Sequence, residues 1–340
     1  MKATKDVAVL VPTINCDRQL EKMISHALLD ETLDGESIFV VIDGGVTEAE
    51  ILNSLQAKGV KFKVRAERGG VAAALNSGLE IISSKYVRRM DADDEWINGS
   101  LNSDLLNLLG KHTMVFGYTL NKKNGRYFKS AIPDLPEGKL SKFAFLPGNP
   151  ITHPAVSFDR NKIHELGDYA QFALAEDFEL WMRLLLGGYT IYNSNLPTVV
   201  YSRDQNLASS KLLSKNVLGE VQEKWLELVG VEFELTEHFL GLAICRNIEC
   251  EHTSSDVRKY REDLSKTLKK LRDLPLHPRV YMNIFIRSII TLIAHEPKLK
   301  TITYCFAETI NKPSLLPNYF QMYLQDRWKL LKFNKSLGNN

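Results

Sequence analysis

The stretch Tyr86-Val87-Arg88-Arg89-Met90-Asp91-Ala92-Asp93-Asp94 joins a short strand-like run to three carboxylates within four positions. Such a cluster at a strand end suits a hard divalent cation, because oxygen ligands select Mg²⁺ or Mn²⁺. Without a cation or a cationic partner, the neighbouring carboxylates would repel one another. The spacing alone also allows a different interpretation, an acidic turn that caps a helix starting near Trp96.

Strands and helices are expected to alternate through the first half of the chain. Runs of apolar and β-branched residues predict buried strands at 7–11, 37–42, 61–64 and 86–90, with helices over 20–29, 48–57 and 71–83. This alternation predicts a parallel sheet with helices on both faces. Pro12, Asp43 and Asp91 all follow strand ends, where ligands bind in such sheets, so one crevice should collect them.

The second half changes character near residue 205. Before it, we expect strands at 114–118, 155–158 and 199–201, a polar excursion over 121–138, and a helix over 175–186 that ends at Gly187-Gly188. Beyond it, the pattern is almost wholly helical, over 212–229, 239–250, 257–271 and 281–294. We therefore predict a catalytic domain over 1–204 and a helical C-terminal region over 205–340.

The composition is that of an ordinary globular protein. The chain has 340 residues, of which 44% are hydrophobic and 25% charged, and its net charge of +2 gives no strong attraction to nucleic acid. The four cysteines lack zinc-finger spacing, which favours free thiols in a reducing compartment. We find no signal peptide, and Arg287 interrupts the apolar run 284–294. These features predict a cytoplasmic protein, either free or peripheral at the inner face of the plasma membrane.

Several short motifs occur in an order that is more specific than any one of them. Together they resemble the family-2 glycosyltransferases of the GT-A fold, which build bacterial polysaccharides, over residues 7 to about 203. The motifs are Val-Pro-Thr-Ile-Asn (11–15), Asp-Gly-Gly (43–45), Gly-Val-Ala-Ala-Ala-Leu-Asn-Ser-Gly-Leu (70–79), Arg-Met-Asp-Ala-Asp-Asp (89–94), Asn-Pro-Ile-Thr-His-Pro (149–154) and Ala-Glu-Asp-Phe-Glu-Leu-Trp (175–181).

The resemblance implies a mixed, mainly parallel sheet flanked by helices and a nucleotide-diphosphate sugar donor, expected to be a UDP-sugar. Asp91 resembles the first carboxylate of the family's DxD motif, which faces ribose and metal, and Asp93 resembles the second, a direct ligand of Mn²⁺ or Mg²⁺. Asp94 either supports Asp93 or caps the helix that follows. The other residues expected to bind the donor are Pro12, Thr13, Asn15, Asp43, Arg68, Gly70 and Arg203.

The resemblance also implies a general base. Asp177 looks like the group that takes the proton from the acceptor hydroxyl, with Glu176 as the alternative; helix capping is the structural interpretation of both. His153 and Trp181 are candidates for contact with acceptor or phosphate, although a helical Trp is commonly a core residue. Asp204 stands where the family commonly has a His, so it either replaces an oxygen or nitrogen ligand or marks a missing contact.

These residues predict an inverting, metal-dependent glycosyltransferase that acts on a glycan or lipid-linked acceptor. Two alternatives remain open: a sugar-nucleotide nucleotidyltransferase, and a non-catalytic sugar-binding or scaffold domain. For the C-terminal region we expect packing on the catalytic domain, homo-oligomer contact or membrane-surface contact. The aromatic and basic segment 319–333 suits a membrane surface, and an ordinary docking helix is the alternative.

Overall fold

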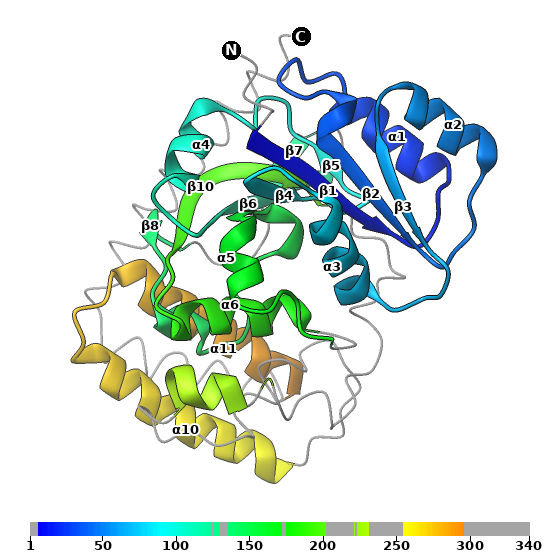
Figure 1. The fold of residues 1–340 in the computed structure, drawn as a ribbon. Coiled ribbons are helices and arrows are strands. Elements are labelled where there is room, and N and C mark those ends of the chain that lie inside the picture. The colour runs from blue at the N-terminus through cyan, green and yellow to red at the C-terminus, as the bar shows by residue number, and fades with distance from the viewer. Residues whose placement is uncertain are drawn as a thin grey trace. The chain divides into compact units, whose positions relative to one another are not determined.

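The computed structural model describes residues 6–123, 126–129, 135–171, 175–201, 221, 223–230 and 254–295 (Figure 1). The chain divides into two compact units. The first consists of residues 1–122, 137–139 and 151–205, and the second of residues 123–136, 140–150 and 206–340. All the described candidate site residues belong to the first unit.

The first unit is built on a mixed sheet with the strand order β3-β2-β1-β4-β9-β6-β10-β5. The pairs β3–β2, β2–β1, β1–β4 and β6–β10 are parallel, whereas β9 runs antiparallel to β4 and β6, and β5 antiparallel to β10. The strands are β1 Val7–Thr13, β2 Ile38–Asp43, β3 Lys61–Arg65, β4 Tyr86–Arg89, β5 Glu95–Trp96, β6 Met114–Lys123, β8 Gly138–Lys139, β9 Val156–Asp159 and β10 Ile191–Val200. The mixed, mainly parallel sheet agrees with the predicted fold class.

Helices cover both faces of the parallel part of the sheet. On one face, alternate residues of β1 and β2 pack with apolar residues of α1 (Arg18–Ala27) and α2 (Ala49–Ala57). On the other face, α3 (Val71–Ile81) packs against β1 and β2. A Cβ atom on Gly78 would lie 2.3 Å from Leu10 Cδ1, so the missing side chain brings α3 close to the sheet.

The expected helix near Trp96 is wrong. Glu95 and Trp96 form β5, which pairs with Val200 and Val199 of β10, and the next helix, α4, spans Ser103–Leu109. Asn102 caps that helix, accepting a hydrogen bond of 3.0 Å from the Leu105 amide. Burial decides the difference, because Trp96 lies in the core with its indole N–H donating to Asp30 at 2.9 Å. Asp94 therefore precedes a strand and caps no helix.

Other elements differ from the sequence predictions mainly in length. Strands β6 and β10 extend beyond the predicted segments 114–118 and 199–201, and the helix α5 (Arg160–Glu165) was not predicted. Helix α6 (Glu176–Leu186) begins one residue after the predicted position and ends before Gly187-Gly188 as expected. Strand pairing lengthens β10, because it pairs with β6 from Ile191 to Val200, with register shifts on either side of Pro197.

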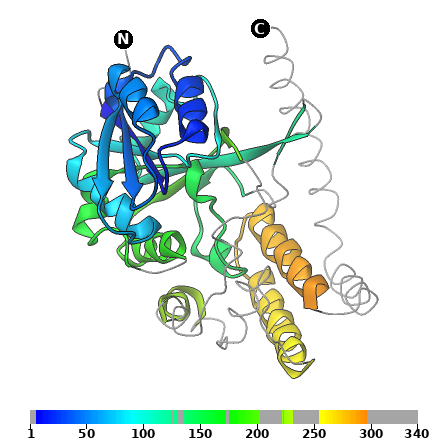
Figure 2. The ribbon, with the colours of Figure 1, turned by 90° about the vertical axis from the view of Figure 1, so that its right-hand side faces the viewer.

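The second unit contains helices α10 (Ser254–Arg272) and α11 (Pro278–His295), which contact each other (Figure 2). It also contains β7 (Arg126–Lys129), the short helix η3 (Lys142–Phe145) and the π-helical η6 (Leu226–Gly230). Within it, Trp225 Nε1 donates to the Phe145 carbonyl at 2.9 Å, and Arg287 Nη2 donates to the Asn149 carbonyl at 2.7 Å. The predicted helices 257–271 and 281–294 fall within α10 and α11, whereas 239–250 lies outside the described residues.

Among the described residues, none of the helices is both long and apolar enough to span a bilayer.

Candidate active site

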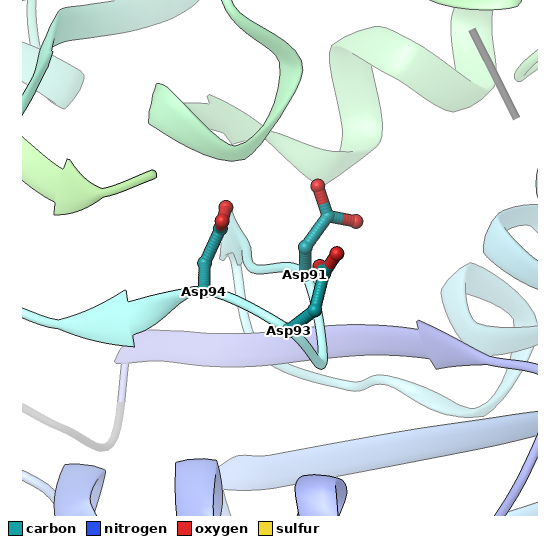
Figure 3. A group of neighbouring side chains, drawn as sticks. All are labelled: Asp91, Asp93 and Asp94. Atoms are coloured by element: carbon teal, nitrogen blue, oxygen red, sulfur yellow. The ribbon is translucent and has the colours of Figure 1, made fainter. Parts of the chain in front are cut away.

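The turn between β4 and β5 carries Asp91, Asp93 and Asp94, whose carboxylates lie on the same side of the turn (Figure 3). One oxygen from each of the three lies within 4.8 Å of the others. Arg89, the last residue of β4, is buried, and its Nη1 lies 2.5 Å from Asp91 Oδ2. Burial by itself would lower the pKa of Arg89, but the adjacent Asp91 outweighs it and the pKa is raised.

This acidic turn fits a hard divalent cation. Three carboxylates offer oxygen ligands at close range, and Asp94 is almost completely buried, at 3% exposure. Like charges at this separation repel unless a cation balances them, and Mg²⁺ and Mn²⁺ are bound by oxygen ligands of this kind. The side chains of Asp91, Asp93 and Asp94 are thus clustered, and the binding of a metal ion by them stays a prediction.

Tyr201 lies beside the acidic turn. Burial, with smaller contributions from the nearby Asp91, Asp94 and Asp93, raises the pKa of its phenol to about 12. The residue follows β10, whose pairing with β5 places its end next to the turn. The next residues expected in the site, Arg203 and Asp204, lie outside the described part of the chain.

The other candidate acids stand at the start of α6. Glu176 is buried, and its burial raises its pKa, whereas Asp177 is partly exposed. Asp177 Oδ1 accepts a hydrogen bond of 2.7 Å from the Phe178 amide, so this carboxylate helps to satisfy the helix start. Ala175, directly before the helix, has a left-handed backbone with φ of 67°. This unusual conformation directs the chain into α6.

His153 connects the two groups of acids. It lies in the short helix η4 (His153–Ala155), with Nε2 3.1 Å from the Tyr169 hydroxyl and Nδ1 3.4 Å from Glu176 Oε1. Burial lowers its pKa to about 3, and Arg89 lowers it too, while Asp177 and Asp91 act in the opposite direction. Asp91 of the acidic turn and Asp177 of α6 therefore both lie close enough to this imidazole to influence its pKa.

Trp181 does not offer a stacking surface in this structure. It is 0% exposed and its ring lies edge-on to His153, with 5.8 Å between ring centroids. Its position is that of a core residue supporting His153, and the predicted acceptor contact receives no support.

The candidate donor-binding residues follow β1, β2 and β3. The Asn15 side chain accepts a hydrogen bond of 3.0 Å from the Val46 amide, and Thr13 Oγ1 donates to the Asn15 carbonyl at 2.9 Å. Pro12 and Thr13 form the end of β1, and Arg68 is exposed in the turn before α3. Asn15 thus joins the loops after β1 and β2. This structural role is additional to its predicted contact with the donor.

Asp43 is enclosed by donors from its own chain. Its carboxylate accepts from Arg65 Nε at 2.8 Å and from the amides of Gly69 and Gly70 at 3.0 and 2.7 Å. With its side chain 5% exposed, Asp43 fixes the backbone of the turn that leads into α3. A nucleobase contact by this residue stays a prediction.

Sequence reasoning missed Arg65 and Tyr169. Arg65 could have been suspected, since it ends a strand beside one that ends in Asp43. Tyr169 carried no local signal, because its role depends on distant residues. Asn76 of α3 donates to the Tyr169 carbonyl at 2.8 Å and accepts from the Tyr169 amide at 3.0 Å, fixing the loop that presents the phenol to His153.

The family model described as "Glycosyl transferase family 2" matches residues 8–164 of this chain, a little under half of its length. Among curated proteins, "Amylovoran biosynthesis glycosyltransferase AmsE" of Erwinia amylovora is 27% identical over 205 residues, covering 57% of this chain and 74% of the relative. "Putative teichuronic acid biosynthesis glycosyltransferase TuaG" of Bacillus subtilis is 26% identical, covering 60% of this chain and 81% of the relative. An uncharacterized glycosyltransferase of Rickettsia felis is 26% identical to this chain. The match covers 62% of this chain but only 36% of that relative's length.

Among solved structures, the crystal structure of S. aureus TarS 1–349 in complex with UDP-GlcNAc superposes with a TM-score of 0.50 and 16% identity. The match covers 93% of this chain and 92% of that chain. At this identity the likeness concerns the fold alone.

Proposed function

We propose that this chain, whose residues 8–164 match the model described as "Glycosyl transferase family 2" and whose relatives include named glycosyltransferases, moves a sugar from a nucleoside diphosphate donor to a hydroxyl group with inversion at the anomeric carbon. A UDP-sugar is the proposed donor. The proposed acceptor is a growing glycan or lipid-linked sugar of a cell-surface polysaccharide, as the names of AmsE and TuaG suggest for those relatives.

The observation that carries the proposal is the clustering of Asp91, Asp93 and Asp94, one oxygen from each lying within 4.8 Å of the others. His153 Nδ1 lies 3.4 Å from Glu176 Oε1 at the start of α6, and the charges of both Asp177 and Asp91 influence the pKa of this imidazole. A one-step displacement needs charge neutralisation on one side of the anomeric carbon and a base on the other. The acidic turn and the start of α6 supply groups for these two tasks.

On the donor side, Asp91, Asp93 and Asp94 would hold a divalent cation, and Arg89 orients Asp91 through their ion pair. When bound, such a cation acts as a Lewis acid that neutralises charge on the departing diphosphate. The loops that end at Thr13 and Gly70 are proposed to surround the nucleoside. The fixed loop geometry reduces the entropy lost when the donor binds.

On the acceptor side, Asp177 is proposed as the general base. Its partial exposure leaves the carboxylate accessible to a hydroxyl group. As the acceptor oxygen forms its bond to the anomeric carbon, the bond from that carbon to the phosphate oxygen breaks, and the hydroxyl proton passes to Asp177. Glu176, which is buried against His153, holds the start of α6 in place.

The test uses the purified chain with a panel of UDP-sugars and MnCl₂, with nucleotide release as the readout. Release of UDP from a UDP-sugar supports the proposal. Release of pyrophosphate from UTP and a sugar 1-phosphate, assayed in parallel, would indicate a nucleotidyltransferase. No turnover with any donor, with or without added acceptor glycans, would favour a sugar-binding domain.

Asp177→Asn then tests the base. We expect transfer to fall by about 10³-fold, since general-base catalysis contributes typically 10² to 10⁴, while the affinity for UDP measured by calorimetry stays within about twofold. The matched control is Asp104→Asn, because Asp104 is an exposed acid in the first turn of α4. Equal loss of transfer and UDP affinity would instead assign Asp177 a structural role.

A further inference from the structure

Arg65 occupies a central place among the loops of the proposed donor side. It is the last residue of β3, in register with Asp43 at the end of the neighbouring β2. Its Nε donates to Asp43 Oδ1 at 2.8 Å, while Nη1 donates to Ser77 Oγ at 2.6 Å and to the Ala73 carbonyl at 3.3 Å. One planar guanidinium therefore joins the ends of two strands to two successive turns of α3.

The turn before α3 is hydrogen-bonded to the carboxylate of this ion pair. Gly70, the residue before the helix, has no side chain to cap it, and the amides of Gly69 and Gly70 instead donate to the carboxylate of Asp43. A carboxylate at a helix N-terminus is favourable because of the helix dipole. However, a carboxylate enclosed in this way needs a counter-charge, and Arg65 provides it.

The turn that precedes α3 is packed directly on the guanidinium. A Cβ atom on Gly69 would lie 2.5 Å from Arg65 Nη2 and 2.8 Å from Ala73 Cβ. On the opposite side, a Cβ atom on Gly44 would lie 2.6 Å from the Arg68 amide nitrogen. The backbone of residues 67–70 is thus confined between Arg65 and the turn after β2, which leaves it little freedom.

From these contacts we infer that Arg65 is a positioning residue for donor binding: through Asp43 and α3 it fixes the turn 67–70, which carries Arg68 and Gly70. The inference rests on the proposed function, in which this turn faces the nucleotide. Arg65 acts through Asp43 and the turn, so its loss should weaken donor binding and leave the chemistry at the acidic turn and Asp177 intact.

The same strand and helix offer a matched control. Lys63, two residues before Arg65 on β3, contacts α3 through Glu80 at 2.7 Å and the Ser77 carbonyl at 3.3 Å. This pair is considerably exposed, at 32% and 65% of the side chains, and does not reach Asp43. Lys63→Met therefore removes a cation and a strand-to-helix contact without disturbing the turn.

The experiment measures UDP binding by calorimetry in the presence of MnCl₂, and donor hydrolysis, for the full chain and its variants. For Arg65→Met we expect about tenfold weaker UDP binding and a similar rise in KM for the donor, equivalent to the loss of one net charged hydrogen bond, with kcat within about twofold. Arg65→Lys should recover part of the affinity, since it keeps the charge without the planar fork. Ser77→Ala should weaken UDP binding by about two- to threefold.

UDP affinity of Arg65→Met equal to that of Lys63→Met would overturn the inference. So would a fall in kcat with unchanged KM. If Arg65→Met does not fold, as judged by thermal denaturation, Arg65→Lys and Ser77→Ala decide the matter by the same criteria. A wild-type chain that binds no UDP and hydrolyses no donor would refute the proposed function itself, whereas binding by the wild type with unaltered binding by the variants would refute the role of Arg65 alone.

Discussion

Two carboxylate-bearing turns at the same edge of the sheet differ sharply in what surrounds them. Asp43, the last residue of β2 where the following turn begins, is enclosed by an arginine and two backbone amides supplied by its own chain. Asp91, Asp93 and Asp94, after β4, lie within 4.8 Å of one another and concentrate negative charge. The first arrangement is what a structural carboxylate needs, and the second is suited to binding a cation. Strand-end acids therefore have to be distinguished by their neighbours and not by their position.

The largest expected effect concerns activity at the acidic turn. Asp93→Asn should lower metal-dependent turnover of the donor by about 10³-fold or more, because a neutral amide is a poor ligand for a hard cation that neutralises the leaving group. Its free energy of unfolding without metal should change by no more than about 1 kcal/mol, since one of three neighbouring like charges is removed. Steady-state kinetics and urea denaturation measure the two quantities. Unchanged turnover would contradict the metal-binding role.

At Asp43 we expect a large effect on stability. Asp43→Asn leaves Arg65 without its counter-charge and turns an amide toward backbone donors, so the free energy of unfolding should fall by about 3 kcal/mol. Urea denaturation compares this variant with Asp104→Asn, whose carboxylate is exposed. If Asp43→Asn were as stable as that control, the distinction between the two turns would fail.

A smaller effect is expected on the pH dependence of stability, through the buried His153 between the acidic turn and α6. The pKa of His153 is lowered to about 3, from an ordinary value of 6.5, chiefly by burial. Below pH 6.5 the unfolded chain binds a proton that the folded chain does not, so stability is lost as the pH falls toward 3. Between pH 7 and pH 5 this loss amounts to about 2 kcal/mol.

His153→Gln should remove most of this acid sensitivity, because glutamine does not titrate. Urea denaturation at pH 7 and pH 5 gives the difference for each variant. Glu176 affects the pH dependence of the unfolding free energy in the opposite direction. Burial raises its pKa in the folded chain, so its contribution to stability is lost as the pH rises. A variant as acid-sensitive as the wild type would show that His153 is not the buried group responsible.

The smallest effect is expected at an exposed pair beside the acidic turn. Lys122 Nζ lies 3.3 Å from Glu95 Oε2, with 47% and 41% of the side chains exposed. Exposed pairs of this kind contribute about 0 to 1 kcal/mol, so Lys122→Met should change the free energy of unfolding by less than about 0.5 kcal/mol. A loss comparable with that of Asp43→Asn would mean that proximity to the turn, and not enclosure, determines the cost.

Much of the fold was accessible from local pattern. The apolar runs at 7–11 and 38–42 indicate strands of a buried sheet. Helices α3 and α6 follow from helical spacing, with glycines directly before α3 and directly after α6. The helix expected near Trp96 failed because strand pairing with β10 and a hydrogen bond to Asp30 outweigh local tendency. The antiparallel β9 likewise depends on partners distant in sequence.

The candidate site divides in the same way. Alone, the sequence determined that three acids follow a strand and that Asp177 opens a helix, because adjacent residues and period-specific spacing define those features. Tertiary structure alone decided that Asp43 is enclosed by Arg65, that Tyr169 reaches His153, and that His153 senses both Asp91 and Asp177. These relations join residues tens of positions apart, and only chain packing brings such residues within hydrogen-bonding or Coulombic range.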